Sequence, residues 1–144
     1  MTYTPELALR FFAYSESYLE FKHDVAPFLD MFVMKQKKGF DMGRLQGNFD
    51  RVNNFVHKYF QPPYFATPKR SNATPRVRFE AISVGVHLAL LKNPNLENPD
   101  LTWLNSDEFK YHTTTDASNN QGKLKARIEF VRDCLLGINH YTDE

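Results

Sequence analysis

The chain has little cysteine, no long apolar run and almost no net charge, and each shortage excludes a class of protein. Its 144 residues include one cysteine, Cys134, so no internal disulfide can form, as is typical of proteins of the reducing cytoplasm. No apolar stretch is long enough to span a bilayer, and the N-terminus lacks a basic segment followed by an apolar run. We therefore predict a soluble cytoplasmic protein with no membrane partner.

The charge balance excludes the strongly basic and the strongly acidic classes of protein. The sequence holds 18 lysines and arginines against 17 aspartates and glutamates, which gives a formal net charge of +1. This balance is not typical of a histone-like nucleic-acid binder or of an acidic mimic. Any function that depends on charge must therefore come from a local cluster.

Sequence motifs for catalysis, cofactor binding and metal binding are missing as well. The six glycines are dispersed and none forms a Walker-type phosphate loop, and there is no Gly-x-Ser-x-Gly elbow for a nucleophile. No two of the five histidines have the i, i+4 spacing of a helical zinc site. We therefore predict no enzymatic activity, no cofactor and no metal, and we expect His87 and Cys134 to lie in the core. A small hydrolase would require a cleft that gathers histidine and carboxylate groups.

What the sequence does contain is apolar residues at helical spacing. The clearest series precedes Pro62-Pro63 and consists of Met42, Leu45, Phe49, Val52, Val56 and Tyr59. Shorter series predict further helices near residues 5–14, 28–33, 79–90 and 124–135, and a short helix or two single turns near residues 101–111. We expect Asn93-Pro94 and Gly137 to end the helices that precede them, and Asp107-Glu108 to cap or begin a helix. In the segment 79–90, one buried side is predicted, made of Phe79, Ile82, Val86 and Leu90.

Together these segments predict a single all-α domain over residues 1–144, a compact bundle of about five or six helices. Aromatic residues make up 15% of the chain, so the core should be built around rings, with Trp103 as an anchor. Long loops are expected near residues 61–75 and 112–121, and a turn near residues 15–22. Gly43 and Gly47 weaken the helix that contains them, which favours a tight helix contact as their reason.

Basic residues gather in clusters at predicted helix ends and in the adjoining loops. The candidate DNA-binding residues in these clusters are Lys69, Arg70, Arg76, Arg78, Lys123, Lys125 and Arg127. Such positions can reach DNA phosphates without disturbing the core. The competing interpretation is that these side chains only keep the surface soluble and interact favourably with the negative ends of the helix dipoles. The near-zero net charge of the chain supports this interpretation.

Several segments of this chain resemble one known family. They are Arg10-Phe11-Phe12-Ala13, Phe28-Leu29-Asp30-Met31-Phe32, Arg78-Phe79-Glu80-Ala81-Ile82, and Arg127 in the last predicted helix. Over roughly residues 7–136, the chain resembles the helical region that follows the ParB-like domain in GmrSD-type proteins, which belong to domain-of-unknown-function family 262. The motifs are loose, being mainly aromatic and aliphatic positions with a few arginines.

The resemblance implies a function but transfers no catalytic residue. In that family, NTP-dependent cleavage of modified foreign DNA belongs to an upstream domain with an Asp-Gly-Gln-Gln-Arg sequence, which this chain does not contain. The chain is therefore expected to be a fragment or remnant that lacks the ParB-like domain. We predict a non-catalytic accessory or scaffold domain of a DNA-modification-dependent restriction or phage-defence protein, with DNA and a catalytic ParB-like domain as partners. The alternative is a stand-alone helical protein–protein interaction domain. Such a domain could act as a monomer or as a homodimer.

Three arginines of the family-like segments have two competing interpretations. Arg10, Arg78 and Arg127 each lie beside predicted core aromatics, where a guanidinium can reach a phosphate or pair with a carboxylate. Internal pairing is the favoured interpretation, with Glu80 or Asp30 as partner, because a buried charge is costly unless it is paired.

Overall fold

The computed structural model describes residues 5–21, 25–36, 42–65, 76–114 and 121–138. The helices in these ranges are α1 (Pro5–Ser17), α2 (Val25–Gln36), α3 (Met42–Tyr59), α4 (Arg76–Lys92), α5 (Asp107–Thr114) and α6 (Gln121–Leu136). Two 3₁₀ turns accompany them, η1 (Tyr18–Glu20) and η3 (Thr102–Asn105). No strand occurs in the described ranges, so the predicted all-α fold is confirmed.

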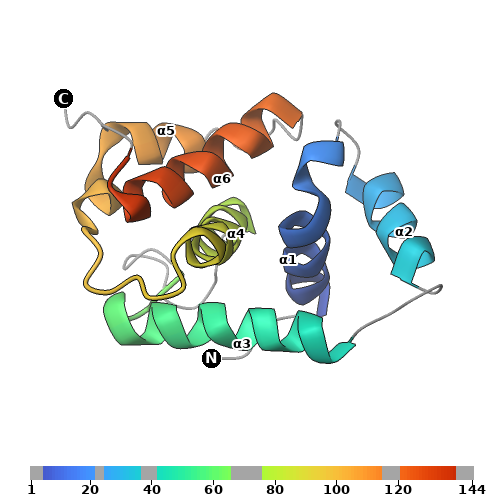
Figure 1. Ribbon diagram of the computed structural model, residues 1–144. Helices are drawn as coiled ribbons and strands as arrows, with labels where there is room; N and C mark the ends of the chain where they lie inside the picture. The colour runs from blue at the N-terminus through green and yellow to red at the C-terminus, as the bar shows by residue number, and fades with distance from the viewer. Residues whose placement is uncertain (1–4, 22–24, 37–41, 66–75, 115–120, 139–144) are drawn as a thin grey trace.

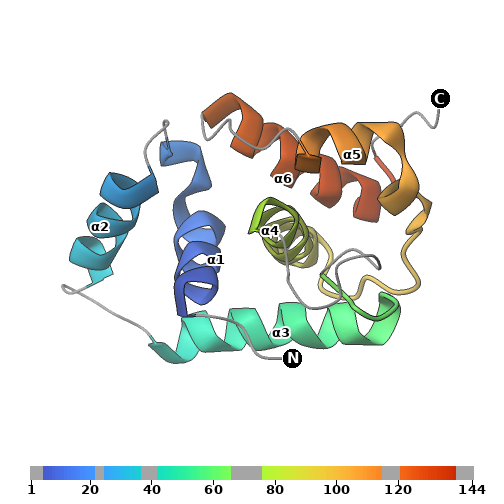
Figure 2. The same ribbon diagram turned by 180° about the vertical axis from the view of Figure 1, so that it is seen from behind.

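Helix α4 lies at the centre of the bundle (Figures 1 and 2). It packs against α6, α1, α3 and α5, whereas α2 lies at the edge and packs against α1. The predicted buried side of α4 is confirmed, because Phe79, Ile82, Val86 and Leu90 are all buried. The predicted buried side is nevertheless narrower than the observed one, because nearly every residue from Val77 to Leu90 is buried. A helix that is surrounded by other helices has no solvent-exposed face, so its sequence shows no continuous polar stripe opposite the apolar one.

Aromatic rings fill the core, as predicted. Trp103 is fully buried and its indole N–H donates a hydrogen bond to the carbonyl of Asp100 at 2.7 Å. Its ring meets Phe109 and Phe130 edge to face, with centroids 5.1 and 6.2 Å away. Such contacts bury a large apolar area and satisfy the polar end of the indole. Cys134 is also buried, in line with its predicted core position.

Two loop predictions need correction. The loop expected over residues 112–121 begins too early, because α5 continues to Thr114. The turn expected near residues 15–22 is helical for most of its length, since α1 extends to Ser17 and η1 follows. Of the loop expected over residues 61–75, only 61–65 are described, and there the N–H of Tyr64 donates to the carbonyl of Gln61 at 2.9 Å. Residues 66–75 lie outside the described ranges.

The tight helix contact predicted for Gly47 is wrong. A Cβ atom added at Gly47 would meet no other atom within 4 Å. The glycine that is closely packed is Gly85 on α4, which faces α6. Nothing in the structure explains the glycine at position 47.

None of the helices within the described ranges combines the length and the apolar character that crossing a membrane requires.

Candidate functional site

A charge cluster lies between α1, α4 and α6, in the core of the bundle. The Glu80 side chain is 1% exposed and its Oε2 accepts a hydrogen bond from Nη1 of Arg10 at 3.1 Å. The second carboxylate oxygen, Oε1, lies 3.8 Å from Nη1 of Arg127, whose side chain is 2% exposed. The predicted internal pairing of Arg10 and Arg127 is therefore confirmed. The partner is Glu80 and not Asp30, which is exposed on α2.

Burial and mutual attraction shift the pKa values of these groups in opposite directions. Burial raises the pKa of Glu80, while the guanidinium groups of Arg10, Arg76 and Arg127 oppose that rise. Burial likewise lowers the pKa of Arg127, and Glu80 opposes this change. The phenol of Tyr14 lies in the same field, and burial raises its pKa to about 12. An ion pair buried this deeply is a structural element of the core, and its removal is expected to destabilise the fold.

Arg78 has a separate internal role. Its Nε donates a hydrogen bond to the carbonyl of Phe65 at 2.8 Å, and its guanidinium carbon lies 5.2 Å from the centroid of the Phe109 ring. Burial lowers the pKa of Arg78 to about 10. The side chain therefore ties the turn after α3 to α4 and α5.

The other candidate DNA-binding residues are divided between the interior and the surface. Arg76 is half-buried and lies in the electrostatic field of Glu80 and Tyr14. Lys125 is exposed on α6, and Lys69 and Arg70 lie outside the described residues. The described candidates thus differ in exposure, and contact with DNA phosphates stays a prediction for those that reach the surface.

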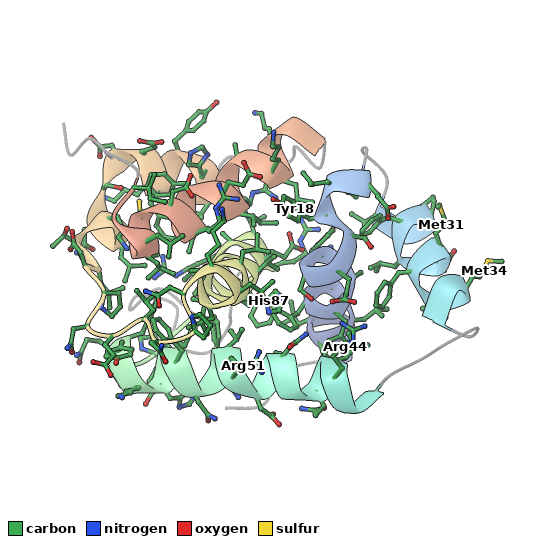
Figure 3. The ribbon with its side chains drawn as sticks, viewed as in Figure 1. Tyr18, Met31, Met34, Arg44, Arg51 and His87 are labelled. Atoms are coloured by element: carbon green, nitrogen blue, oxygen red, sulfur yellow. The ribbon has the colours of Figure 1, made fainter. Side chains whose placement is uncertain are left out.

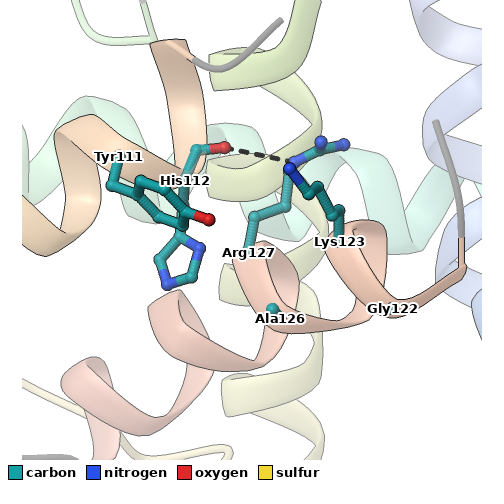
Figure 4. A pocket seen from close by; sticks show the side chains of 6 residues that line it. All are labelled: Tyr111, His112, Gly122, Lys123, Ala126 and Arg127. Atoms are coloured by element: carbon teal, nitrogen blue, oxygen red, sulfur yellow. Dashed lines mark hydrogen bonds between the residues drawn. The ribbon is translucent and has the colours of Figure 1, made fainter. Parts of the chain in front are cut away.

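A small hollow lies between α5 and the start of α6 (Figure 4). It encloses about 120 Å³ and is lined by Tyr111, His112, Gly122, Lys123, Ala126 and Arg127. Its polar groups already have partners in the protein: Nε of Arg127 donates to the carbonyl of His112 at 3.3 Å, and Nζ of Lys123 lies 5.9 Å from the centroid of the Tyr111 ring. His112 Nε2 in turn lies 3.6 Å from a carboxylate oxygen of Glu108. Several polar groups that line the hollow are therefore engaged with other residues of the protein.

A larger groove lies between the second half of α3 and the segment after α4. It encloses about 310 Å³, and its walls come from residues 51–59 on one side and residues 94–97 on the other. No three histidine, cysteine, aspartate or glutamate side chains in the described ranges are arranged so that they could hold a metal ion.

No protein-family model matches this chain, and no curated protein or solved structure shows significant similarity to it. The resemblance to family 262 therefore stays a prediction.

The outer face of α2 exposes several apolar side chains. Phe28 and Phe32 of α2 are buried, and Phe28 stacks on Tyr14 of α1 with centroids 5.3 Å apart. On the opposite side, Met31 and Met34 are 56% and 65% exposed and project away from the bundle (Figure 3). Sequence reasoning did not identify this face. The available signal was a helix of twelve residues with apolar side chains on more than one side.

Buried histidines predict how stability depends on pH. Burial lowers the pKa of His87, whose ring centroid lies 5.9 Å from that of Phe11, and Glu16 opposes this shift. Burial also lowers the pKa of His112, and Glu108 opposes that shift. The unfolded chain therefore takes up protons near pH 6.5 while the folded state resists them. We expect the contribution of these two histidines to the free energy of unfolding to be fully present above pH 6.5 and to fall as the pH decreases below it.

Urea unfolding at pH 7.5, 6.5 and 5.5 tests this expectation. The variant His87→Gln should show a shallower fall in the free energy of unfolding over this interval than the parent chain. An identical slope in the two proteins would contradict the assignment to His87.

Proposed function

We propose that this chain is a non-catalytic helical scaffold that binds a second protein domain through the outer face of α2. The observation that carries the proposal is the exposure of Met31, Val33 and Met34 on one short helix. Contiguous exposed apolar side chains are typical of protein interaction sites. Methionine side chains are flexible and polarisable, which suits them to a contact surface.

The position of α2 supports this role. The helix lies at the edge of the bundle and packs against α1, so its outer side is open to a partner (Figure 1). Its inner side is firmly attached, because Phe28 packs against both Tyr14 and Phe21. A rigid base with an adaptable outer surface presents its contacts at little conformational cost.

The family resemblance supplies the class of partner. It implies the catalytic ParB-like domain of a DNA-modification-dependent restriction or phage-defence protein. The inward orientation of Arg10, Arg78 and Arg127 favours scaffolding over direct contact with DNA phosphates. The alternative, a stand-alone interaction domain that forms a homodimer, would use the same face of α2.

A double variant, Met31→Glu/Met34→Glu, tests the proposal. Both side chains are exposed, so the fold should survive while two carboxylates disrupt an apolar interface. The binding probe is a ParB-like domain with the Asp-Gly-Gln-Gln-Arg sequence, expressed from a reading frame adjacent to the gene for this chain. We expect the double variant to bind it at least tenfold more weakly. The matched control is Leu91→Glu, which replaces another exposed apolar residue, on α4.

Light scattering and DNA titration separate the alternatives. A parent chain that is dimeric, with a monomeric double variant, would support the stand-alone interaction domain. DNA binding that weakens with salt and is lost in Lys123→Glu/Lys125→Glu would support direct phosphate contact. A monomer that binds neither DNA at low salt nor the ParB-like domain would overturn the proposal.

A further inference from the structure

We propose that the groove between α3 and the segment 94–97 binds an extended acidic peptide segment with one large apolar side chain. This inference goes beyond scaffolding through α2, because it concerns other helices and a different ligand. The groove measures about 310 Å³, within the size range of small ligand sites. The side chains of its floor and those of its rim differ in polarity, and each set limits which side chains a bound ligand can place there.

The floor of the groove is apolar and aromatic. The rings of Phe55 and Tyr59 are 4.8 Å apart between centroids, and Phe55 is 7% exposed. Leu90 of α4 is also buried, and the half-buried side chain of Leu96 closes the opposite side. A surface of this kind gains most from contact with a phenylalanine or leucine side chain.

The rim carries polar groups with few partners in the part of the chain that the structure describes. The ammonium of Lys58 lies over the Tyr59 ring, 5.2 Å from its centroid, and within the described ranges neither Lys58 nor Glu97 forms an ion pair. The side-chain amides of Asn54 and Asn95, on opposite walls, make no hydrogen bond there either. Each amide can both donate and accept, which matches the N–H and C=O groups of an extended backbone.

The spacing of the cations on α3 favours an acidic ligand of defined length. Arg51 and Lys58 are both exposed and line the same wall, two helical turns apart. Seven residues of helix span about 10.5 Å. A peptide in the polyproline II conformation covers about 9.3 Å in three residues and returns to the same side. Two acidic residues at positions i and i+3 would therefore meet both cations, with the apolar residue between them on the floor.

The cations remain available for such a ligand. Arg51 uses one N–H in a hydrogen bond from Nη1 to Oδ1 of Asn48 at 3.2 Å, which leaves other donors of its guanidinium for a carboxylate. In Figure 3, Arg51 lies on α3, well separated from Met31 and Met34 of α2. Glu97 on the facing wall disfavours a ligand that is acidic on both sides. The acidic side chains should therefore lie along α3 alone.

The test uses the full chain labelled with ¹⁵N and the peptide Gly-Ser-Glu-Phe-Pro-Glu-Ser-Gly. Titration at 0.15 M salt should shift the side-chain amide signals of Asn54 and Asn95, with a dissociation constant below about 1 mM. Lys58→Glu should weaken binding at least tenfold. Its matched control, Lys125→Glu on α6, should leave binding unchanged because that exposed lysine does not line the groove.

Two control ligands make the outcome decisive. A peptide with lysine in place of both glutamates should not shift these signals, and one with alanine in place of phenylalanine should bind at least tenfold more weakly. Absence of any shift at a peptide concentration of about 5 mM, well above the expected dissociation constant, would overturn the inference. Equal weakening by Lys58→Glu and Lys125→Glu, or stronger shifts with a single-stranded oligonucleotide, would overturn it too.

Discussion

Replacing Glu80 by glutamine is expected to destabilise the fold by about 3–5 kcal/mol. The substitution keeps the shape of the side chain but removes the negative charge that faces Arg10 at 3.1 Å and Arg127 at 3.8 Å. Two buried guanidinium groups would then face a neutral amide, with Arg76 adding to the positive field. Breaking a buried ion pair on one side is costly because the remaining charge stays desolvated.

Urea unfolding measures this loss, and Glu16→Gln is the matched control. Glu16 pairs with Arg44 at 2.8 Å, but the two side chains are 23% and 47% exposed, so its replacement should cost less than about 1 kcal/mol. The double variant Arg10→Met/Glu80→Gln should be less destabilised than the sum of its single variants, since both remove the same interaction. Equal losses for Glu80→Gln and Glu16→Gln would show that the central cluster does not support the fold.

The helices of this chain could be predicted where the sequence contains clear boundary signals. Asn93-Pro94 predicted the end of α4, which the structure places at Lys92. Gly137 predicted the end of α6 and has φ +74°, while its N–H donates to the carbonyl of Cys134 at 3.1 Å. Asp107 predicted the start of α5. Such signals act within a few residues of the chain, so they are readable without the tertiary structure.

Features that depend on packing between distant segments could not be predicted. The sequence of α4 contains Glu80, Ser83 and His87 among apolar residues. His87 was expected in the core, but burial of nearly the whole helix was not indicated. Their burial follows from the helices that surround α4. The groove beside α3 joins residues about 40 positions apart, and neither wall is distinctive alone. The partner of Arg10 was predictable because a carboxylate within a family-like segment was an evident candidate for pairing.

Replacing Gly85 by alanine is expected to destabilise the fold by about 1–3 kcal/mol, although alanine favours helix. An added Cβ would lie 2.5 Å from Cγ1 and 2.6 Å from Cβ of Val131, and 3.1 Å from the carbonyl oxygen of Ile128. A new rotamer of Val131 moves Cγ1 but not Cβ or the backbone oxygen, so it cannot relieve the overlap. Helices α4 and α6 would have to separate, and they form the most extensive helix contact in the described fold.

The matched control for Gly85→Ala is Gly47→Ala, which makes the same chemical change with the opposite expected sign. Nothing lies within 4 Å of a Cβ at position 47, so alanine there should stabilise the fold by up to about 1 kcal/mol through helix propensity alone. Urea unfolding of the two variants separates packing from propensity, because the propensity gain is common to both. A Gly85→Ala protein as stable as Gly47→Ala would mean that α4 and α6 are not in close contact at this position.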